Sequence, residues 1–161
     1  MRVKTILIAL LLAPALGQAA DSLRLADRTE IQEVMAKYVW TVDSLDADGY
    51  VSVFTEDATI DSNGTLSKGH EQIRKIVTGL IERRDAAKAN GQPTANLYHV
   101  ISNVRISFTG RNEALHESYW QTVRRRDNAM VAAAMGRSED RLVKRNGKWL
   151  IQSRKLIVFT D

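Results

Sequence analysis

The second half of the chain contains the feature that most restricts its fold. From Leu97 onward, apolar and polar residues alternate with a period of two, the pattern of β-strands that bury one face. Asn146-Gly147 lies between two such runs, and this dipeptide is the strongest short-range signal for a β-hairpin. The sequence therefore predicts four antiparallel strands joined by hairpins. Their expected ranges are 97–108, 114–124, 130–145 and 148–159.

Helical periodicity is confined to the first half. Apolar residues recur every three or four positions over 31–42 and again over 73–81. The segment 27–30 resembles a capping box with Asp27 as N-cap, which predicts that the first helix begins there. Between the helices, 50–60 predicts a short strand. Helices followed by a series of strands indicate the α+β class, with the helices packed on one face of a curved sheet.

Length and composition limit the domain organisation and the chemistry. The chain has 161 residues, of which 44% are hydrophobic and 26% charged, as expected for one globular domain with a core. There is no cysteine, which excludes disulfides, thiolate catalysis and zinc sites built on cysteine.

The first twenty residues have the layout of a secretory signal peptide. Arg2 and Lys4 precede an apolar run over 6–16, and small residues follow it. The run is shorter than the roughly 20 residues that a membrane-spanning helix needs. We therefore expect cleavage after Ala19 or Ala20, no stable membrane insertion afterwards, and a secreted or periplasmic domain formed by residues 21–161.

Charge gives no indication of a nucleic-acid partner. The formal net charge of +4 includes Arg2 and Lys4, so the mature chain carries about +2. The densest basic cluster, 124–126, lies beside Asp127 and is expected to form a turn. A basic stripe with interleaved aromatic residues, as nucleic-acid binding requires, is missing from the sequence.

Several short motifs, each weak by itself, occur in one order along almost the whole mature chain. They lie at 25–31, Tyr38, 42–43, 54–58, 69–73, His99 with Asn103, and 146–149. Together they resemble the SnoaL-like branch of the nuclear-transport-factor-2-like superfamily. The resemblance implies a cone-shaped α+β barrel with an open apolar pocket, in which homodimers or homotrimers are common. It does not imply a particular reaction, because the fold hosts both enzymes and proteins without catalytic activity.

The resemblance to eliminating enzymes of this family indicates the candidate catalytic residues. These enzymes are bile-acid dehydratase, hexachlorocyclohexane dehydrochlorinase and scytalone dehydratase. In the first two, a histidine on the sheet pairs with an aspartate at the end of the first helix, and His99 and Asp43 occupy the matching positions. Tyr38 matches a tyrosine of the bile-acid dehydratase, where the dehydrochlorinase has lysine. Arg154 lies five residues after Trp149, which matches an arginine of the dehydrochlorinase.

These residue types support proton abstraction from carbon. A neutral His99 can act as base, oriented by Asp43. Tyr38 and Arg154 can stabilise negative charge on the substrate or the departing group. The resemblance thus implies a dehydratase-like lyase or an isomerase for a small hydrophobic substrate, polycyclic compounds included, without metal or organic cofactor. The predicted substrate-binding residues are Tyr50, Phe54, Ile101, Asn103 and Trp120.

Each candidate also has a structural interpretation. Tyr38 lies on the apolar stripe of its helix and fits a core role. Asp43 fits an exposed helix end, and strict alternation leaves His99 facing either a pocket or solvent unless a bulge intervenes. Arg154 is expected to pair with Glu139 across the hairpin.

The other histidines and Trp40 receive structural interpretations. His70 is expected to be solvated and His116 to point outward, while Trp40 suits a subunit contact. Two alternatives to the lyase remain: a non-catalytic periplasmic binding or interaction protein, and a steroid-isomerase-like site with an aspartate such as Asp43 as base.

Overall fold

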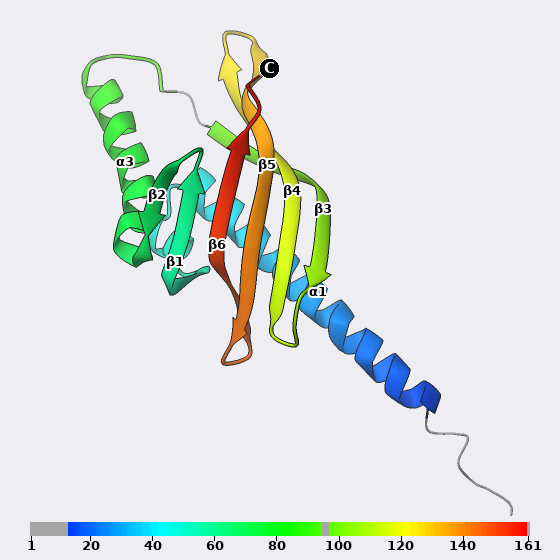
Figure 1. Ribbon diagram of the computed structural model, residues 1–161. Coiled ribbons are helices and arrows are strands. Elements are labelled where there is room, and N and C mark those ends of the chain that lie inside the picture. The colour runs from blue at the N-terminus through cyan, green and yellow to red at the C-terminus, as the bar shows by residue number, and fades with distance from the viewer. Residues whose placement is uncertain (1–12, 95–96, 161) are drawn as a thin grey trace, which may run out of the picture.

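Three helices pack on one six-stranded, mostly antiparallel sheet (Figure 1). The computed structural model describes residues 13–94 and 97–160, so the start of the expected signal peptide, 1–12, lies outside the described residues. The helices are α1 (Ala13–Asp43), α2 (Ala47–Val51) and α3 (Gly69–Ala89). The strands are β1 (Phe54–Ser62), β2 (Thr65–Lys68), β3 (Leu97–Phe108), β4 (Glu113–Arg126), β5 (Ala129–Arg145) and β6 (Lys148–Val158). The predicted α+β class is confirmed.

The strand order across the sheet is β2-β1-β6-β5-β4-β3. Strands β3 to β6 form the predicted antiparallel series, and Asn146 and Gly147 both have positive φ in the β5–β6 turn. β1 runs parallel to β6 and lies between it and the edge strand β2. The expected strand over 50–60 is partly wrong, because α2 includes Tyr50 and Val51 and the strand begins only at Phe54.

Helix α1 continues through the segment that was expected to cap it. Asp27 lies inside the helix, so the predicted N-cap is wrong. Its carboxylate accepts hydrogen bonds from Lys144 Nζ at 2.8 Å and Trp149 Nε1 at 2.9 Å. Burial raises the pKa of Asp27, but these two hydrogen bonds outweigh it and hold the pKa below its usual value. Asp27 therefore fastens α1 to the β5–β6 hairpin instead of starting the helix.

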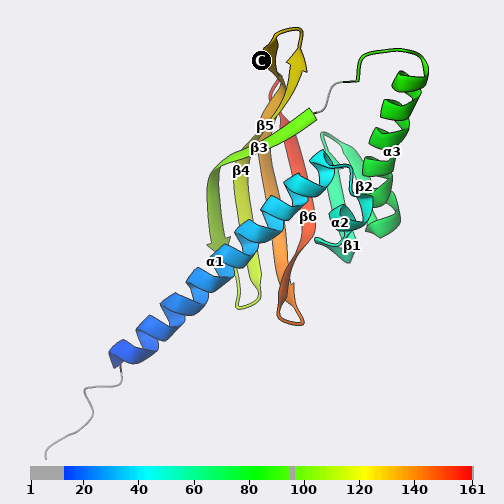
Figure 2. The ribbon, with the colours of Figure 1, turned by 180° about the vertical axis from the view of Figure 1, so that it is seen from behind.

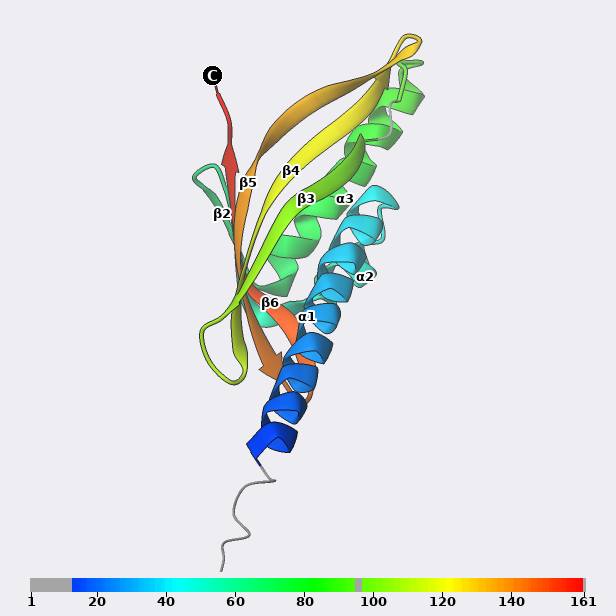
Figure 3. The same ribbon diagram turned by 90° about the vertical axis from the view of Figure 1, so that its right-hand side faces the viewer.

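The core lies between the helices and one face of the sheet. Figure 2 shows α1 crossing this face diagonally, and Figure 3 shows α1 and α3 on the same side of the curved sheet. Among the described residues, no helix is both long enough and apolar enough to cross a membrane. Buried apolar side chains of the core include Ile31, Met35, Tyr38, Val42, Tyr50, Phe54, Ile73, Val77, Leu142, Trp149 and Ile151.

Candidate functional site

His99 of β3 and Asp43 at the end of α1 are in direct contact. The Nδ1 atom of His99 lies 2.6 Å from Asp43 Oδ1, and the His99 backbone N–H donates to Asp43 Oδ2 at 3.0 Å. The side chains are 21% and 15% exposed, so the pair is sheltered but open to solvent. Because the carboxylate holds both the main chain and the ring, the orientation of the imidazole is fixed. In its neutral form, donation from Nδ1 leaves the lone pair on Nε2.

The His99–Asp43 pair lines a hollow of about 540 Å³ between α1 and β3. Val39 and Trp40 of α1 form its apolar wall, and Ser44 and Tyr98 complete it. The volume lies within the range of small-molecule pockets, roughly 300–1,000 Å³. A basic imidazole nitrogen beside apolar walls can take a proton from a bound carbon acid.

A β-bulge in β3 determines which residues face inward. Asn103 has φ 52°, and the pairing with β4 shifts between Ser102 and Arg105. Before the bulge, the inner face carries His99; after it, the inner face carries Ile106. Uniform alternation would have placed these two residues on opposite faces, and the bulge is what brings both to the inner face. The bulge also leaves Asn103 exposed in an outer-face hollow with Arg105 and Tyr119, away from the His99–Asp43 pair.

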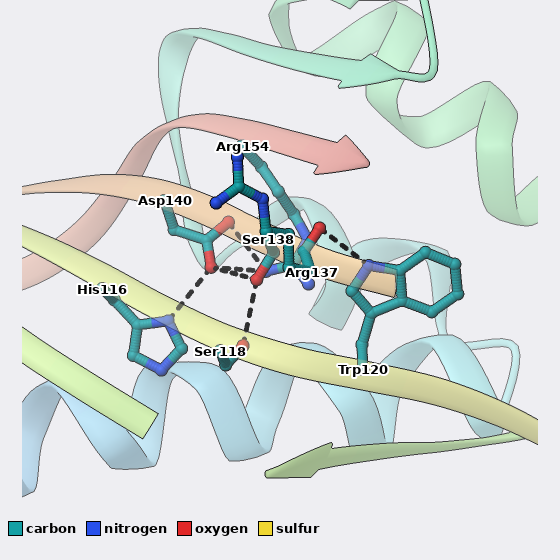
Figure 4. Close-up of polar contacts among 7 residues, drawn as sticks. All are labelled: His116, Ser118, Trp120, Arg137, Ser138, Asp140 and Arg154. Carbon is teal, nitrogen blue, oxygen red and sulfur yellow. Dashed lines mark hydrogen bonds and ion pairs between the residues drawn. The ribbon is translucent and has the colours of Figure 1, made fainter. Parts of the chain in front are cut away.

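A second polar group crosses the middle of the sheet. His116 of β4 lies opposite Asp140 of β5, which lies opposite Arg154 of β6, and Figure 4 shows the three side chains in contact. Arg154 Nη1 donates to both Asp140 oxygens at 2.9 Å, and His116 Nδ1 lies 3.1 Å from Asp140 Oδ2. His116 and Asp140 are 1% and 0% exposed.

Two interpretations of single residues change as a result. His116, expected to point outward, is buried and bound to Asp140. Arg154 was expected to pair with Glu139, but a bulge between Arg141 and Leu142 shifts the register by one residue and places Asp140 opposite it.

Tyr38 and Arg154 lie together in the interior. The Arg154 guanidinium carbon is 4.2 Å from the centre of the Tyr38 ring, and the ring of Tyr38 lies 5.2 Å from that of Tyr50. Burial lowers the pKa of Arg154, but the charge of Asp140 and the neighbouring tyrosines raise it above the usual value. Burial, with Tyr38 beside it, raises the pKa of Tyr50 well above 10.0. The charge of Arg154 is therefore matched by Asp140, and neither Tyr38 nor Arg154 lines the hollow at His99.

The remaining predicted substrate-binding residues occupy three different environments. Tyr50 and Phe54 are core residues, 5.4 Å apart between ring centres. Ile101 lines a second, smaller hollow beside His116. Trp120 is half-buried and donates its Nε1–H to the Arg137 carbonyl at 3.0 Å.

Another hollow and the third histidine lie apart from these two groups. A hollow of about 830 Å³ lies between α1 and the β5–β6 turn, with Glu33, Lys37 and Lys148 in its lining, and contains none of the predicted site residues. His70 is half-buried and its Nε2 lies 3.1 Å from the Phe54 carbonyl oxygen, so it is not simply solvated. Within 13–94 and 97–160, no three histidine, aspartate or glutamate side chains converge as a metal site would require.

Comparison with known proteins gives the family. The SnoaL-like domain matches residues 23–155. The chain belongs to the SnoaL-like domain family. No curated protein matches the sequence of this SnoaL-like chain.

Solved structures agree on the fold. An NTF2-like protein with a cystatin-like fold from Novosphingobium aromaticivorans has a TM-score of 0.75 and 21% identity, covering 88% of each chain. A protein from the same species, provisionally assigned as a scytalone dehydratase, has a TM-score of 0.69 and 20% identity, covering 87% of this chain and 89% of its own. LinA has a TM-score of 0.71 and 18% identity, covering 87% of this chain and 90% of its own. At these identities the likeness shows the cone-shaped NTF2-like fold alone.

Proposed function

We propose that this SnoaL-like protein is a cofactor-independent lyase, dehydratase-like in its β-elimination, or an isomerase that begins with the same proton abstraction. The observation that carries the proposal is the 2.6 Å contact between His99 Nδ1 and Asp43 Oδ1 beside an open, partly apolar hollow. The substrate class that fits the hollow is a small hydrophobic molecule, polycyclic compounds included, with one end at the imidazole. This function is compatible with the scytalone dehydratase assignment of a structural neighbour.

In the proposed elimination, His99 Nε2 removes a proton from the carbon next to a carbonyl. The electrons of the broken C–H bond form the new C=C bond, and the hydroxyl on the neighbouring carbon leaves with its bonding pair. The His99 imidazolium then gives its proton to the departing hydroxyl, so the products are the unsaturated ketone and water. Asp43 stabilises the imidazolium between the two transfers. In an isomerisation, the same proton returns to a different carbon.

A binding role is the second candidate, and one observation favours it. Of the four predicted catalytic residues, only His99 and Asp43 line the hollow; Tyr38 and Arg154 are buried against Asp140 and Tyr50. A periplasmic small-molecule-binding or interaction protein would need the hollow but not a fully assembled catalytic group. In the steroid-isomerase-like alternative, Asp43 would be the base, but its two oxygens already accept hydrogen bonds from His99.

The test is exchange of substrate hydrogen in D₂O. The protein is incubated with β-hydroxyketones of one to four rings, and deuterium incorporation and loss of water are followed by mass spectrometry. Wild type should catalyse one or both reactions, and His99→Gln should lose them. Asp48→Asn and His70→Gln are the matched controls, because Asp48 is exposed on α2 and His70 lies at the start of α3. Binding of a ketone without exchange would favour the binding role, whereas full activity in His99→Gln would move the base elsewhere.

We also propose that the protein is exported and that 1–20 is removed after Ala19 or Ala20. One observation supports this: the family match begins at residue 23, after both expected cleavage points. The mass of the protein recovered from the periplasmic fraction gives the cleavage point. A full-length mass there would contradict the proposal.

A homodimer or homotrimer is the proposed assembly, through the outer face of the sheet. Tyr119, Met135 and Phe159 are large, exposed side chains on or beside this face, and the rings of Tyr119 and Phe159 are 6.1 Å apart. Light scattering should give two or three chains per particle for wild type and one for Met135→Glu. A monomeric wild type would overturn it. Trp40, which the sequence suggests for a subunit contact, is 76% exposed and lines the hollows at His99 and His116.

A further inference from the structure

We propose that His116 forms a second ligand site, which binds a hydroxyl-bearing ring, such as a phenol, through a hydrogen bond from the ligand O–H to His116 Nε2. This site does not depend on chemistry at His99. Three observations support the proposal: the position of the His116 imidazole in the sheet, the hydrogen bonds that fix its tautomer, and the hollow that its Nε2 atom faces.

The hydrogen bonds around Asp140 determine which His116 nitrogen carries the proton. Arg154 balances the charge of Asp140 and occupies both of its oxygens, so no second cation is needed beside this carboxylate. Ser138 donates its hydroxyl hydrogen to Asp140 Oδ2 at 3.1 Å, and Ser118 must therefore donate to Ser138 across their 3.0 Å contact. Asp140 can only accept from His116, so Nδ1 is the protonated nitrogen of the neutral ring and Nε2 has the lone pair.

The Nε2 atom is left without a partner in the protein. Within the described part of the chain, no group is hydrogen-bonded to it, although His116 is 1% exposed. Figure 4 shows this second ring nitrogen directed away from Asp140, toward the side on which α1 lies. Among the described residues, the buried side-chain atoms that lack a hydrogen-bond partner are Thr55 Oγ1 and Arg154 Nε; His116 Nε2 is not one of them, so this acceptor keeps contact with the hollow that His116 lines and can be reached by a ligand.

The hollow on that side is open and mainly apolar. It has a volume of about 270 Å³ and lies between α1 and the edge strand β3. Its floor is Met35 with His116, and its mouth is formed by exposed Gln32, Ala36 and Val104. An apolar cavity of about 150 Å³ is enough to bind benzene, so a single ring fits here. One fixed acceptor among apolar walls selects a ring that bears one O–H donor.

The site adjoins the His99 hollow but is separate from it. Val39 and Trp40 line both hollows, whereas His116 lines only one and His99 only the other. The two imidazoles can therefore be tested independently.

Phenol and toluene make a matched pair of probes, because they differ by a hydroxyl in place of a methyl group. Titration of the purified protein, followed by tryptophan fluorescence and calorimetry, should give about tenfold tighter binding of phenol, the effect of one hydrogen bond. His116→Asn keeps a donor near the Nδ1 position for Asp140 but removes the acceptor, so the preference should disappear. His116→Gln keeps an acceptor near the Nε2 position and should retain part of it. His99→Ala should leave the preference unchanged.

Nitrogen-15 spectra of labelled wild type test the proposal even if the His116 variants do not fold. The His116 ring should be the Nδ1–H tautomer, and its Nε2 resonance should shift with phenol but not with toluene. Protonated Nε2, equal affinities for the two probes, or a preference that is lost in His99→Ala but survives in His116→Asn would each overturn the proposal. None of these outcomes decides whether His99 is a catalytic base, which the D₂O experiment tests separately.

Discussion

The two histidine–aspartate pairs of this protein have the same chemical groups in opposite settings. The His99–Asp43 pair joins β3 to α1 and lies at a surface hollow, and no lysine or arginine of the described residues forms an ion pair with its aspartate. The His116–Asp140 pair joins neighbouring strands, is buried, and shares its carboxylate with Arg154. The first aspartate can stabilise a charge that appears on its histidine. The second already has its counter-charge, so its histidine is better suited to hold a fixed hydrogen bond.

Giving both histidines the same substitution would test this difference most strongly. His99→Gln should lower the rate of deuterium exchange or elimination by about 10²–10⁴-fold, the usual contribution of a general base, with little change in stability. His116→Gln should instead lower the free energy of unfolding by about 1–3 kcal/mol, because a buried hydrogen bond to Asp140 is lost. Exchange rates and urea unfolding measure the two effects. Equal effects of both variants on rate and stability would abolish the distinction.

Removing the counter-charge tests the buried pair. Arg154→Met leaves the Asp140 carboxylate in the interior without its cation and should cost about 3–5 kcal/mol in the free energy of unfolding. Adding Asp140→Asn should recover part of this loss, since no charge then remains buried. The measurement is urea unfolding at neutral pH. If Arg154→Met alone were as stable as wild type, the charge of Asp140 would have to be compensated by another group, with His116 the nearest candidate.

The sequence predicted the His99–Asp43 pair and missed the His116–Asp140 pair for physical reasons. His99 and Asp43 were found because their residue types and positions resemble family motifs. The alternation of β4 places His116 on the same face as Ala114, which is buried, and this is the sequence signal for its inward position. What alternation could not give was the partner of Arg154. Regular pairing outward from the Asn146-Gly147 turn would place Glu139 opposite Arg154. The bulge at Arg141 and Leu142 shifts the register, so that Asp140 lies opposite Arg154 instead.

The fold was more predictable than the site because the hairpin turns and periodicities are local. The antiparallel series of β3 to β6 follows from alternation and turn residues. The parallel pairing of β1 with β6 depends on contacts between distant segments, which periodicity does not encode. α2 was missed because its five residues are too few to show a helical repeat. The bulge at Asn103 depends on one residue in the left-handed region, which alternation of side chains does not reveal.

The bulge at Asn103 lets two residues of β3 face inward: His99, which precedes it, and Ile106, which follows it. Asn103→Val should destabilise the protein by about 1–2 kcal/mol, since a β-branched residue is strained at positive φ. Asn103→Gly, the matched variant, should stay within about 0.5 kcal/mol of wild type. Thermal and urea unfolding give both values. A larger loss for glycine than for valine would show that the Asn103 side chain, and not the backbone conformation, maintains the bulge.

Asp27 is an intermediate case between the two pairs, since its carboxylate is 14% exposed and bound to Lys144, which is 23% exposed. Asp27→Asn should cost about 1 kcal/mol at pH 7, a small value because the pair is partly solvated. The folded pKa of Asp27 is below its ordinary 3.8, because the Lys144 and Trp149 hydrogen bonds outweigh the opposing effect of burial. Its contribution is therefore complete above pH 4 to 5 and disappears as the pH falls through the folded pKa.

Lys144 gives this pH dependence an upper limit as well. The hydrogen bonds that Lys144 donates to Asp27 and Glu30 raise the pKa of Lys144 above 10.5, so its contribution is present below that pH and is lost only as the pH rises through the folded value. The difference in unfolding free energy between wild type and Asp27→Asn should thus be constant from about pH 5 to pH 9 and shrink toward zero below pH 3. Asp85→Asn, an exposed control beside Arg84, should change stability by less than about 0.5 kcal/mol at every pH. A difference that persisted undiminished at pH 2 would mean that Asp27 stabilises α1 through its shape and its bond to Trp149, and that charge contributes nothing to the attachment.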